Sequence, residues 1–205
     1  MKTNGKFISL EGIDGCGKTT LRDQLSDYLQ GKYEILMLRE PGGTEVSEKI
    51  REMLLDVRNV GIRPHTEAFL YAASRSQLVE EVILPALQEG KVVIADRFMD
   101  STIAYQGYGR GIDIEFLKVL NLLCTGGVKP ELTLLLDIEP EEGQRRRDQQ
   151  APDRLENEGV EFQRRVREGY LEMQKNEPER IKLINGGTGI IEVREQALQY
   201  LSVLL

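Results

Sequence analysis

The sequence predicts an α/β protein in which helices cover both faces of a five-stranded parallel sheet. Five short apolar runs are each bounded by charged or turn-forming residues, as buried strands are. These runs cover residues 7–10, 33–38, 92–95, 132–136 and 181–184. Longer amphipathic stretches with helical periodicity separate or follow them. Such alternation of strand and helix is typical of parallel sheets that are covered on both sides.

Six helices are expected from this periodicity. They cover residues 19–30, 46–55, 66–88, 114–123, 160–174 and 192–205. Pro85 lies inside the longest of them, and we expect it to kink or end that helix because proline has no N–H to donate. The 205 residues suit a single domain, residues 1–205, because one core usually serves chains of up to about 250 residues.

Composition narrows the function classes and the cellular location. The net charge of −7 argues against a nucleic acid or a membrane surface as partner, since both attract basic proteins. Two cysteines are too few for a disulfide framework, which indicates a reducing compartment. The amino-terminal residues lack the pattern of a signal peptide, and no apolar run approaches the roughly 20 residues of a membrane span. We therefore expect a cytoplasmic protein.

Residues 12–19 form a phosphate-binding loop of the pattern G-x-x-x-x-G-K-[ST]. The nucleotide-binding residues are Gly12, Ile13, Asp14, Gly15, Cys16, Gly17, Lys18 and Thr19. Glycines let backbone N–H groups turn toward phosphate oxygens, Lys18 adds a positive charge, and the hydroxyl of Thr19 is a ligand for Mg²⁺. The motif follows a predicted strand and precedes a predicted helix, so it predicts a P-loop NTPase fold.

The loop alone leaves the reaction open, because GTPase switches and mechanical ATPases carry it too. A guanine-specific switch needs an N-K-x-D box, which this sequence lacks. Two apolar runs end in an aspartate, Asp96 or Asp137, and either is a candidate for the carboxylate near the metal. Arg97 follows Asp96 directly, and a guanidinium binds phosphate oxygens in a bidentate manner. This pairing favours phosphoryl transfer to a second substrate.

The sequence resembles bacterial thymidylate kinases in five segments that occur in the same order over residues 11–156. The segments are EGIDGCGKTT, REPGGT, YAASRSQLVE, DRFMDSTIAYQG and DRLE. The resemblance implies a nucleoside monophosphate kinase domain that phosphorylates dTMP to dTDP with ATP and Mg²⁺, in dTTP biosynthesis. It also implies a homodimer formed through packed helices. A kinase for another nucleotide and a P-loop ATPase or switch are the alternatives.

The resemblance also assigns roles on the acceptor side. Tyr71 would stack on the thymine ring, and Arg75, four residues on and on the same helix face, would reach a base carbonyl. Arg97 would hold the acceptor phosphate, with Arg39 nearby. Asp14 would contact the acceptor sugar or organise the transfer site.

Four further residues of the DRFMDSTIAYQG segment complete this substrate site. The resemblance implies that Ser101 and Thr102 face the base, that Tyr105 lies where a ribose 2′-hydroxyl would protrude, and that Gln106 lies near the nucleoside. Exclusion of a 2′-hydroxyl would favour deoxyribose.

The polar segment 144–158 breaks the strand-helix pattern, and we expect it to be an exposed, mobile lid. The phosphate loop has no arginine, so the cations for transfer have to come from elsewhere, and this segment carries Arg145, Arg146, Arg147 and Arg154. The resemblance to the bacterial type implies that the lid carries the catalytic arginine. The sequence leaves open which of Arg145, Arg146 and Arg147 reaches the γ-phosphate, and Arg147 and Arg154 are the arginines we assign to the transferring phosphate.

The complete catalytic set predicted is therefore Lys18, Arg97, Asp96, Asp14, Arg147 and Arg154, with Thr19 and Asp96 at the metal. Glu161 matches a carboxylate position near the metal in some relatives.

Overall fold

The computed structural model describes residues 4–147 and 153–205 and confirms the predicted α/β architecture. Five parallel strands form one sheet in the order β2-β3-β1-β4-β5. The strands are β1 (Lys6–Glu11), β2 (Ile35–Arg39), β3 (Val92–Asp96), β4 (Leu132–Asp137) and β5 (Ile181–Asn185). Each lies at a predicted apolar run, although β2 starts two residues later than expected.

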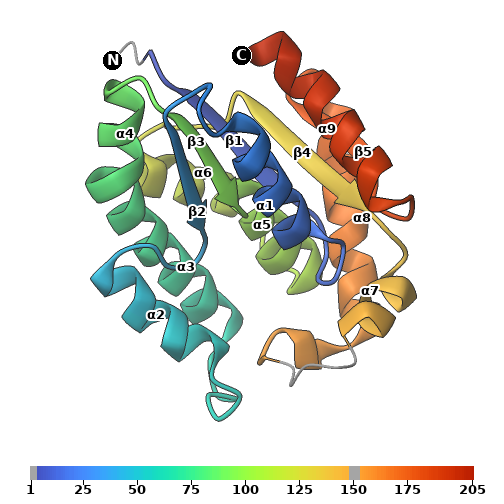
Figure 1. Cartoon of the computed structure of the whole chain (residues 1–205). Helices are drawn as coiled ribbons and strands as arrows, with labels where there is room; N and C mark the ends of the chain where they lie inside the picture. Colours follow the sequence, from blue (N-terminus) through green and yellow to red (C-terminus); the bar gives the residue numbers. More distant parts are fainter. Residues whose placement is uncertain (1–3, 148–152) are drawn as a thin grey trace.

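Helices cover both faces of the sheet (Figure 1). The α-helices are α1 (Lys18–Leu29), α2 (Glu45–Leu55), α3 (Pro64–Leu78), α4 (Leu84–Gln88), α5 (Met99–Thr102), α6 (Ile114–Thr125), α7 (Pro140–Arg147), α8 (Val160–Asn176) and α9 (Ile190–Leu204). Two π-helices, η1 (Val79–Ile83) and η2 (Ile103–Gly109), and a 3₁₀ turn, η3 (Glu156–Glu158), complete the described elements. Helices α1 and α9 lie on the near face in Figure 1, and α5, α6 and α8 lie behind the sheet.

The two cores follow from the alternation of side chains along the strands. Ile8 and Leu10 of β1 pack with Leu25 of α1, whereas Phe7 points to the opposite face and packs with Leu78 and Ile83. Because β1 is buried on both faces, it reads in sequence as a continuous apolar run.

Pro85 does not end the middle helix. The chain passes from α3 through the wide turn η1, in which the Leu84 N–H donates to the carbonyl of Val79, and then continues as α4 with Pro85 in its first turn. A π turn shifts the hydrogen-bond register, so the missing N–H of proline is tolerated there.

Two expectations about the remaining chain need correction. The chain is helical over residues 99–109, where no helix was among those expected. Ile103 to Gly107 are all buried, so this helix has no exposed polar face and its sequence shows no amphipathic period. The segment 144–158 is not exposed throughout: α7 extends to Arg147, and Arg154 and Leu155 are buried. Residues 148–152, and with them part of the expected lid, lie outside the described residues.

The strand order places the site. Strand β1 is flanked by β3 on one side and β4 on the other, so connections leave it in both directions. In open parallel sheets such a switch point leaves a crevice at the carboxyl ends of the strands. Residues 12–17 lie at this point, between β1 and α1.

Candidate active site

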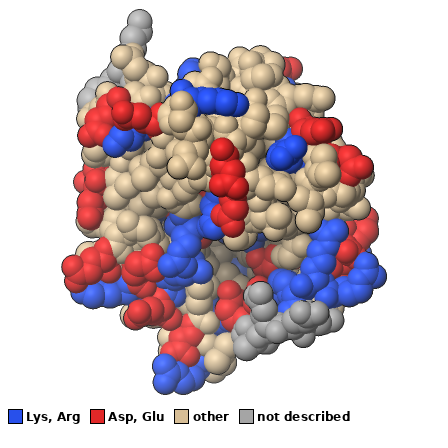
Figure 2. Space-filling model, viewed as in Figure 1, with Lys and Arg blue, Asp and Glu red and all other residues tan. Residues whose placement is uncertain are grey.

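A cavity of about 960 Å³ opens between the phosphate loop, α2 and the end of α7. Of the described residues that line it, eight are Lys or Arg and five are Asp or Glu. Lys and Arg side chains flank the hollow in the lower half of Figure 2. This local excess of positive charge suits phosphate groups, although the whole chain carries a net charge of −7.

The glycines of the phosphate loop are required by its backbone. Gly12, Gly15 and Gly17 have φ angles of 137°, 80° and 100°, which side chains disfavour. A Cβ atom on Gly12 would clash with the carbonyl oxygen of Leu136, and one on Gly15 would clash with that of Gly143. The loop therefore packs between β4 and α7 with no room for a side chain at Gly12 or Gly15.

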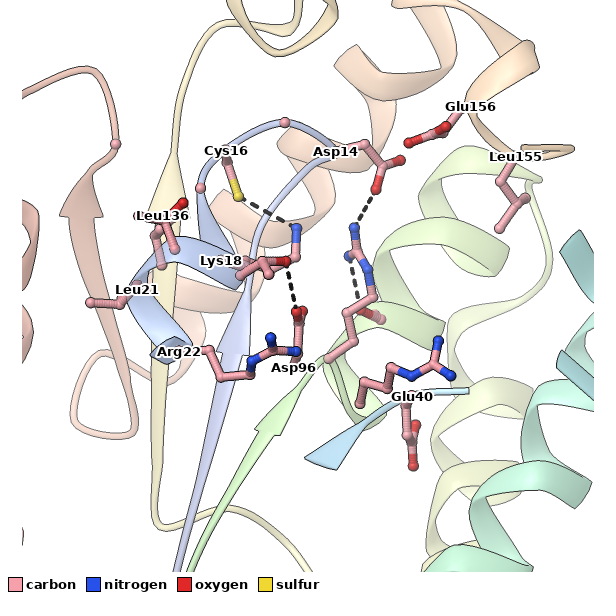
Figure 3. A pocket seen from close by; sticks show the side chains of 18 of the residues that line it. Asp14, Cys16, Lys18, Leu21, Arg22, Glu40, Asp96, Leu136, Leu155 and Glu156 are labelled. Atoms are coloured by element: carbon pink, nitrogen blue, oxygen red, sulfur yellow. Dashed lines mark hydrogen bonds and ion pairs between the residues drawn. The ribbon is translucent and has the colours of Figure 1, made fainter. Parts of the chain in front are cut away.

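Lys18 lies at the start of α1 with its side chain folded back over the loop. Its Nζ donates to the carbonyl oxygens of Gly12 (3.1 Å) and Ile13 (2.9 Å) and lies 3.5 Å from the Sγ of Cys16. Figure 3 shows Lys18 and Asp96 pointing into the same space from α1 and β3. A buried ammonium held only by neutral groups suits an incoming phosphate.

The structure brings the two predicted metal residues together. The hydroxyl of Thr19 donates to Asp96 at 3.4 Å. Both groups offer hard oxygen ligands, and among the described residues no cluster of three or more His, Cys, Asp or Glu side chains could hold an ion. This arrangement fits Mg²⁺, which usually takes one or two protein oxygens, phosphate oxygens and water. Asp137 is engaged by Arg167 at 2.7 and 3.0 Å, so Asp96 is the better placed carboxylate.

Arg97 lies between the phosphate loop and two of the predicted acceptor residues, Ser101 and Tyr105. Its Nη1 donates to the carbonyl of Gly12 at 2.9 Å, its Nη2 forms an ion pair with Asp14, and its guanidinium lies 4.9 Å from the ring centre of Tyr105. Burial favours the neutral form of Arg97, but Tyr105, Asp14 and other neighbours raise its pKa well above the ordinary value. The φ of Arg97, 71°, is left-handed and strained for a side chain, as at many functional sites.

Asp14 is the shared acceptor of this cluster. The Tyr105 hydroxyl donates to it at 3.1 Å, and the Nε2 of Gln163 donates at 2.8 Å. Burial raises the pKa of Asp14, but Arg97 and Lys18 more than offset this effect and hold it below the ordinary value. Gln163 was not among the predicted site residues, because it lies on α8, 149 residues away, and belongs to no motif.

Tyr71 and Arg75 share a face of α3 and both line the cavity. Burial raises the pKa of Tyr71, so its ring is a neutral aromatic surface. Arg75 is 2% exposed and uses its guanidinium on the protein: Glu40 and Thr102 at 2.8 Å, Asn121 at 2.9 Å and the carbonyl of Phe98 at 3.2 Å. Arg75 and Thr102 therefore hydrogen-bond to each other, and Arg75 also bonds to other protein groups. The guanidinium of Arg75, which we expected to reach a base carbonyl, is engaged by the protein.

The other predicted acceptor residues also line the cavity and have protein partners. Arg39 pairs with Glu48 at 2.9 Å, and the Nε2 of Gln106 donates to Glu67 at 2.9 Å. Arg51 was not predicted, yet it lines the cavity and donates to the carbonyl of Pro41 at 2.8 Å. Burial and the nearby charge of Arg39 lower the pKa of Arg51. The only signal in the sequence is a basic residue in an amphipathic helix.

The arginines of the expected lid divide into two groups. Arg146 and Arg147 line the cavity; Arg146 donates to the carbonyl of Gly186 at 3.1 Å, and Arg147 lies 3.4 Å from Glu156. Arg145 is exposed and pairs with Glu142. Arg154, which we expected at the transferring phosphate, is instead held against α2 and α3 and is absent from the described lining. Glu161 is also outside it, exposed and paired with Arg164.

Glu11, at the end of β1, organises the turn that carries Arg97. Its carboxylate accepts from the Phe98 N–H at 2.8 Å, the Ser101 hydroxyl at 2.6 Å and the Tyr170 hydroxyl at 2.7 Å. Burial, and then the charge of Asp100, raise the pKa of Glu11 to about 7. Glu11 is buried and accepts from three donors, so it fixes Phe98, Ser101 and Tyr170 relative to the end of β1.

Glu11→Gln is expected to change how stability depends on pH. The folded-state pKa of Glu11, about 7, exceeds its ordinary 4.5, so its protonation stabilises the fold below pH 4.5 and this contribution is lost as pH rises through 7. The free energy of unfolding of the wild type, minus that of Glu11→Gln, should fall by about 3 kcal/mol from pH 4.5 to 7. Urea titrations across this range measure it. Glu179→Gln, at a 98% exposed side chain, should show no such slope; parallel pH curves for Glu11→Gln and the wild type would contradict the assignment.

A strand-end carboxylate (Asp96), the glycine-rich loop and Arg97 line one cavity, and this arrangement is that of a P-loop phosphotransferase of the nucleotide kinase class. The chain belongs to the thymidylate kinase family, whose family model matches residues 10–197. It is 53% identical to the thymidylate kinase of Thermoanaerobacter sp. (strain X514), over 95% of this chain and 96% of that protein. It is 50% identical to that of Chlorobium luteolum, over 91% of this chain and 92% of the relative.

Solved structures agree with the sequence relatives. The crystal structure of thymidylate kinase from Ehrlichia chaffeensis superposes with a TM-score of 0.79 and 34% identity, covering 96% of this chain and 98% of that one. This confirms the P-loop NTPase fold and sets aside the P-loop ATPase or switch. Within residues 4–147 and 153–205, no helix has both the length and the apolarity needed to cross a membrane.

Proposed function

We propose that this chain transfers the γ-phosphoryl group of ATP to the phosphate of dTMP, forming dTDP and ADP for dTTP synthesis. The observation that carries the proposal is the position of Arg97, whose guanidinium contacts both Gly12 and Asp14 of the phosphate loop. A monophosphate bound at Arg97 lies beside the loop that holds the donor triphosphate. Two anions in one cavity are what in-line phosphoryl transfer needs.

The residues then divide the work by position. Backbone N–H groups of residues 12–17 and the ammonium of Lys18 bind the donor phosphates. Thr19 and Asp96 would hold Mg²⁺, which would supply positive charge against the negative charge of the donor phosphates. Arg97 orients an oxygen of the acceptor phosphate, which forms the new bond to the γ-phosphorus as the bond to the β–γ bridging oxygen breaks.

On the acceptor side, the resemblance and the cavity support dTMP. Tyr71 offers a neutral ring to a pyrimidine, and Tyr105 is held in place by its bond to Asp14. A fixed tyrosine beside the sugar leaves no room for a 2′-hydroxyl, which supports a deoxyribose substrate. The expected cytoplasmic location remains a prediction from the cysteine content of the sequence.

A coupled ADP-release assay tests the acceptor directly. With ATP and Mg²⁺ present, dTMP should give the fastest ADP formation among dTMP, dUMP, dCMP, UMP, CMP, AMP and GMP. Another monophosphate turning over faster than dTMP would support a kinase for that nucleotide. ADP formed at the same rate without any acceptor would overturn the proposal.

Arg147→Ala is expected to lower kcat about 100-fold while the KM for dTMP changes less than about twofold. Arg147, at the end of α7, lines the cavity and lies 3.4 Å from Glu156, which also lines it. The positive charge of Arg147 is therefore available to the transferring phosphoryl group. Steady-state kinetics in both substrates measure the change. Arg164→Ala is the matched control, since Arg164 pairs with Glu141 of α7 but is absent from the described lining. Full turnover by Arg147→Ala would remove Arg147 from the mechanism.

We further propose that the chain is a homodimer that packs through α3 and α6. Apolar side chains of both helices are exposed on the described surface, namely Phe69, Phe116, Val119, Leu122 and Leu123. The rings of Phe69 and Phe116 lie edge to face at 6.0 Å. Contiguous exposed apolar surface of this kind marks interaction sites.

Light scattering after gel filtration should give twice the 23.3 kDa mass of one chain. Leu122→Lys, at a 61% exposed residue of this patch, should shift the protein to the monomer mass, because a charged side chain cannot be buried unpaired. Val203→Lys is the control, since Val203 is 89% exposed on α9, away from this patch. A monomer mass for the wild type would contradict the dimer.

A further inference from the structure

Arg154 is one of the most heavily anchored residues of the polar segment. Its Nε donates to the carbonyl of Leu54 at 2.6 Å, and its backbone N–H donates to the carbonyl of Leu55 at 3.2 Å. Its Nη2 lies 2.7 Å from Glu67 of α3, and only 8% of the side chain is exposed. The residue therefore ties the chain after α7 to the carboxyl end of α2 and to α3.

Glu67 is the common partner of three side chains, those of Arg154, Gln106 and Arg110. Besides Arg154, its carboxylate accepts from the Nε2 of Gln106 at 2.9 Å and from Arg110 at 3.1 and 3.2 Å. Burial raises the pKa of Glu67, but the bonds from Arg110 and Gln106 hold it below the ordinary value, so the group is ionised. Arg110 also pairs with Glu158 at 2.6 Å, which adds a second tie to the same chain segment.

The residues on either side of Arg154 form part of the cavity wall. Asp153, Leu155 and Glu156 line the cavity, and Figure 3 shows Leu155 and Glu156 on the side of it away from Lys18. Leu155 belongs to the core cluster against which Tyr71 packs. Glu67 lies one helical turn before Tyr71, on the same face of α3. The anchor of Arg154 thus sets one wall of the acceptor end.

We infer that Arg154 is a positioning residue of the acceptor site: clamped by Glu67 and the end of α2, it holds the wall beside Tyr71 and Gln106 in place for the acceptor. This inference rests on the proposed function. It assigns Arg154 to binding of the nucleoside monophosphate, whereas Arg147 serves the transferring phosphoryl group. A role for Arg154 at the phosphates would require it to leave both Leu54 and Glu67.

Arg154→Ala is the test, with dTMP and ATP varied separately. We expect the KM for dTMP to rise about tenfold, the size of one buried charged hydrogen bond, with kcat and the KM for ATP within about twofold. Arg154→Lys should restore part of the affinity, because one ammonium reaches Glu67 or Leu54 but lacks the fork that reaches both. Arg58→Ala, which removes an 86% exposed arginine close to the end of α2, is the control and should leave both constants unchanged.

A double-mutant cycle separates the clamp from a general loss of stability. If Glu67 acts through Arg154, then Glu67→Gln combined with Arg154→Ala should raise the KM for dTMP no further than the larger single effect. A drop in kcat of tenfold or more at constant KM for dTMP would return Arg154 to catalysis and overturn the inference. A lower melting temperature with an unchanged KM in the folded Arg154→Ala and Arg154→Lys proteins would also overturn it. Absence of dTMP-dependent ADP formation by the wild type would instead defeat the proposed function.

Discussion

Lys18→Ala is expected to lower kcat about 1000-fold. The ammonium is buried in the phosphate loop, where the carbonyls of Gly12 and Ile13 and the thiol of Cys16 hold it. A preorganised charge costs no reorganisation when negative charge shifts toward the leaving oxygen, so its removal raises the barrier directly. Single-turnover measurements at saturating ATP and dTMP isolate the chemical step.

Lys18→Arg is the informative companion of this variant. The guanidinium keeps the charge but is larger and planar, and it has to replace a side chain that is packed against the loop, with only 7% of Lys18 exposed. We expect it to remain at least about 100-fold below the wild type, because geometry as well as charge stabilises the transition state. A kcat within tenfold of the wild type for Lys18→Ala would show that the loop does not hold the donor phosphates as proposed.

Arg97→Ala is expected to lower kcat/KM for dTMP about 1000-fold. Removing the guanidinium takes away the phosphate ligand and also the cation that contributes most to lowering the pKa of Asp14. The remaining carboxylate then repels the acceptor phosphate, so loss of attraction and gain of repulsion add. Steady-state kinetics with dTMP varied at saturating ATP measure this change, and the KM for ATP should move little.

The backbone at Arg97 supplies a matched control. Its φ of 71° costs an alanine about as much as an arginine, whereas glycine adopts it freely. Arg97→Gly should therefore be about 1 kcal/mol more stable than Arg97→Ala and equally inactive. If either variant kept a kcat/KM near that of the wild type, Arg97 would not be the acceptor-phosphate ligand.

Local patterns in the sequence were sufficient for the fold class and the donor site. Each strand is a short apolar run, and the phosphate loop depends on glycines, Lys18 and Thr19 within eight consecutive residues. Such features are set by backbone conformation and by neighbours along the chain, so they are visible without a structure. The pairing of Thr19 with Asp96 was also predictable. Thr19 lies at the start of a predicted helix and Asp96 at the end of a predicted strand, and in a parallel sheet these ends meet at the same edge.

Contacts between distant segments decided the remaining parts of the site. Gln163 reaches Asp14 from 149 residues away, and Glu11 receives a hydrogen bond from Tyr170 across 159 residues. The charge pattern of the polar segment could not distinguish the role of Arg147 from that of Arg154. The role depends on the groups that each arginine contacts in the fold, and the neighbours in sequence do not reveal them.

The sequence by itself therefore determined a P-loop α/β kinase and its glycine-rich loop, and it predicted residues for the acceptor side. Only the tertiary structure decided how these residues are held: Arg75 by Glu40, Arg97 by Asp14, and Arg154 by Glu67. The physical reason is that a buried charge is stable only beside its counter-charge, and the strand order and helix packing determine which counter-charge that is.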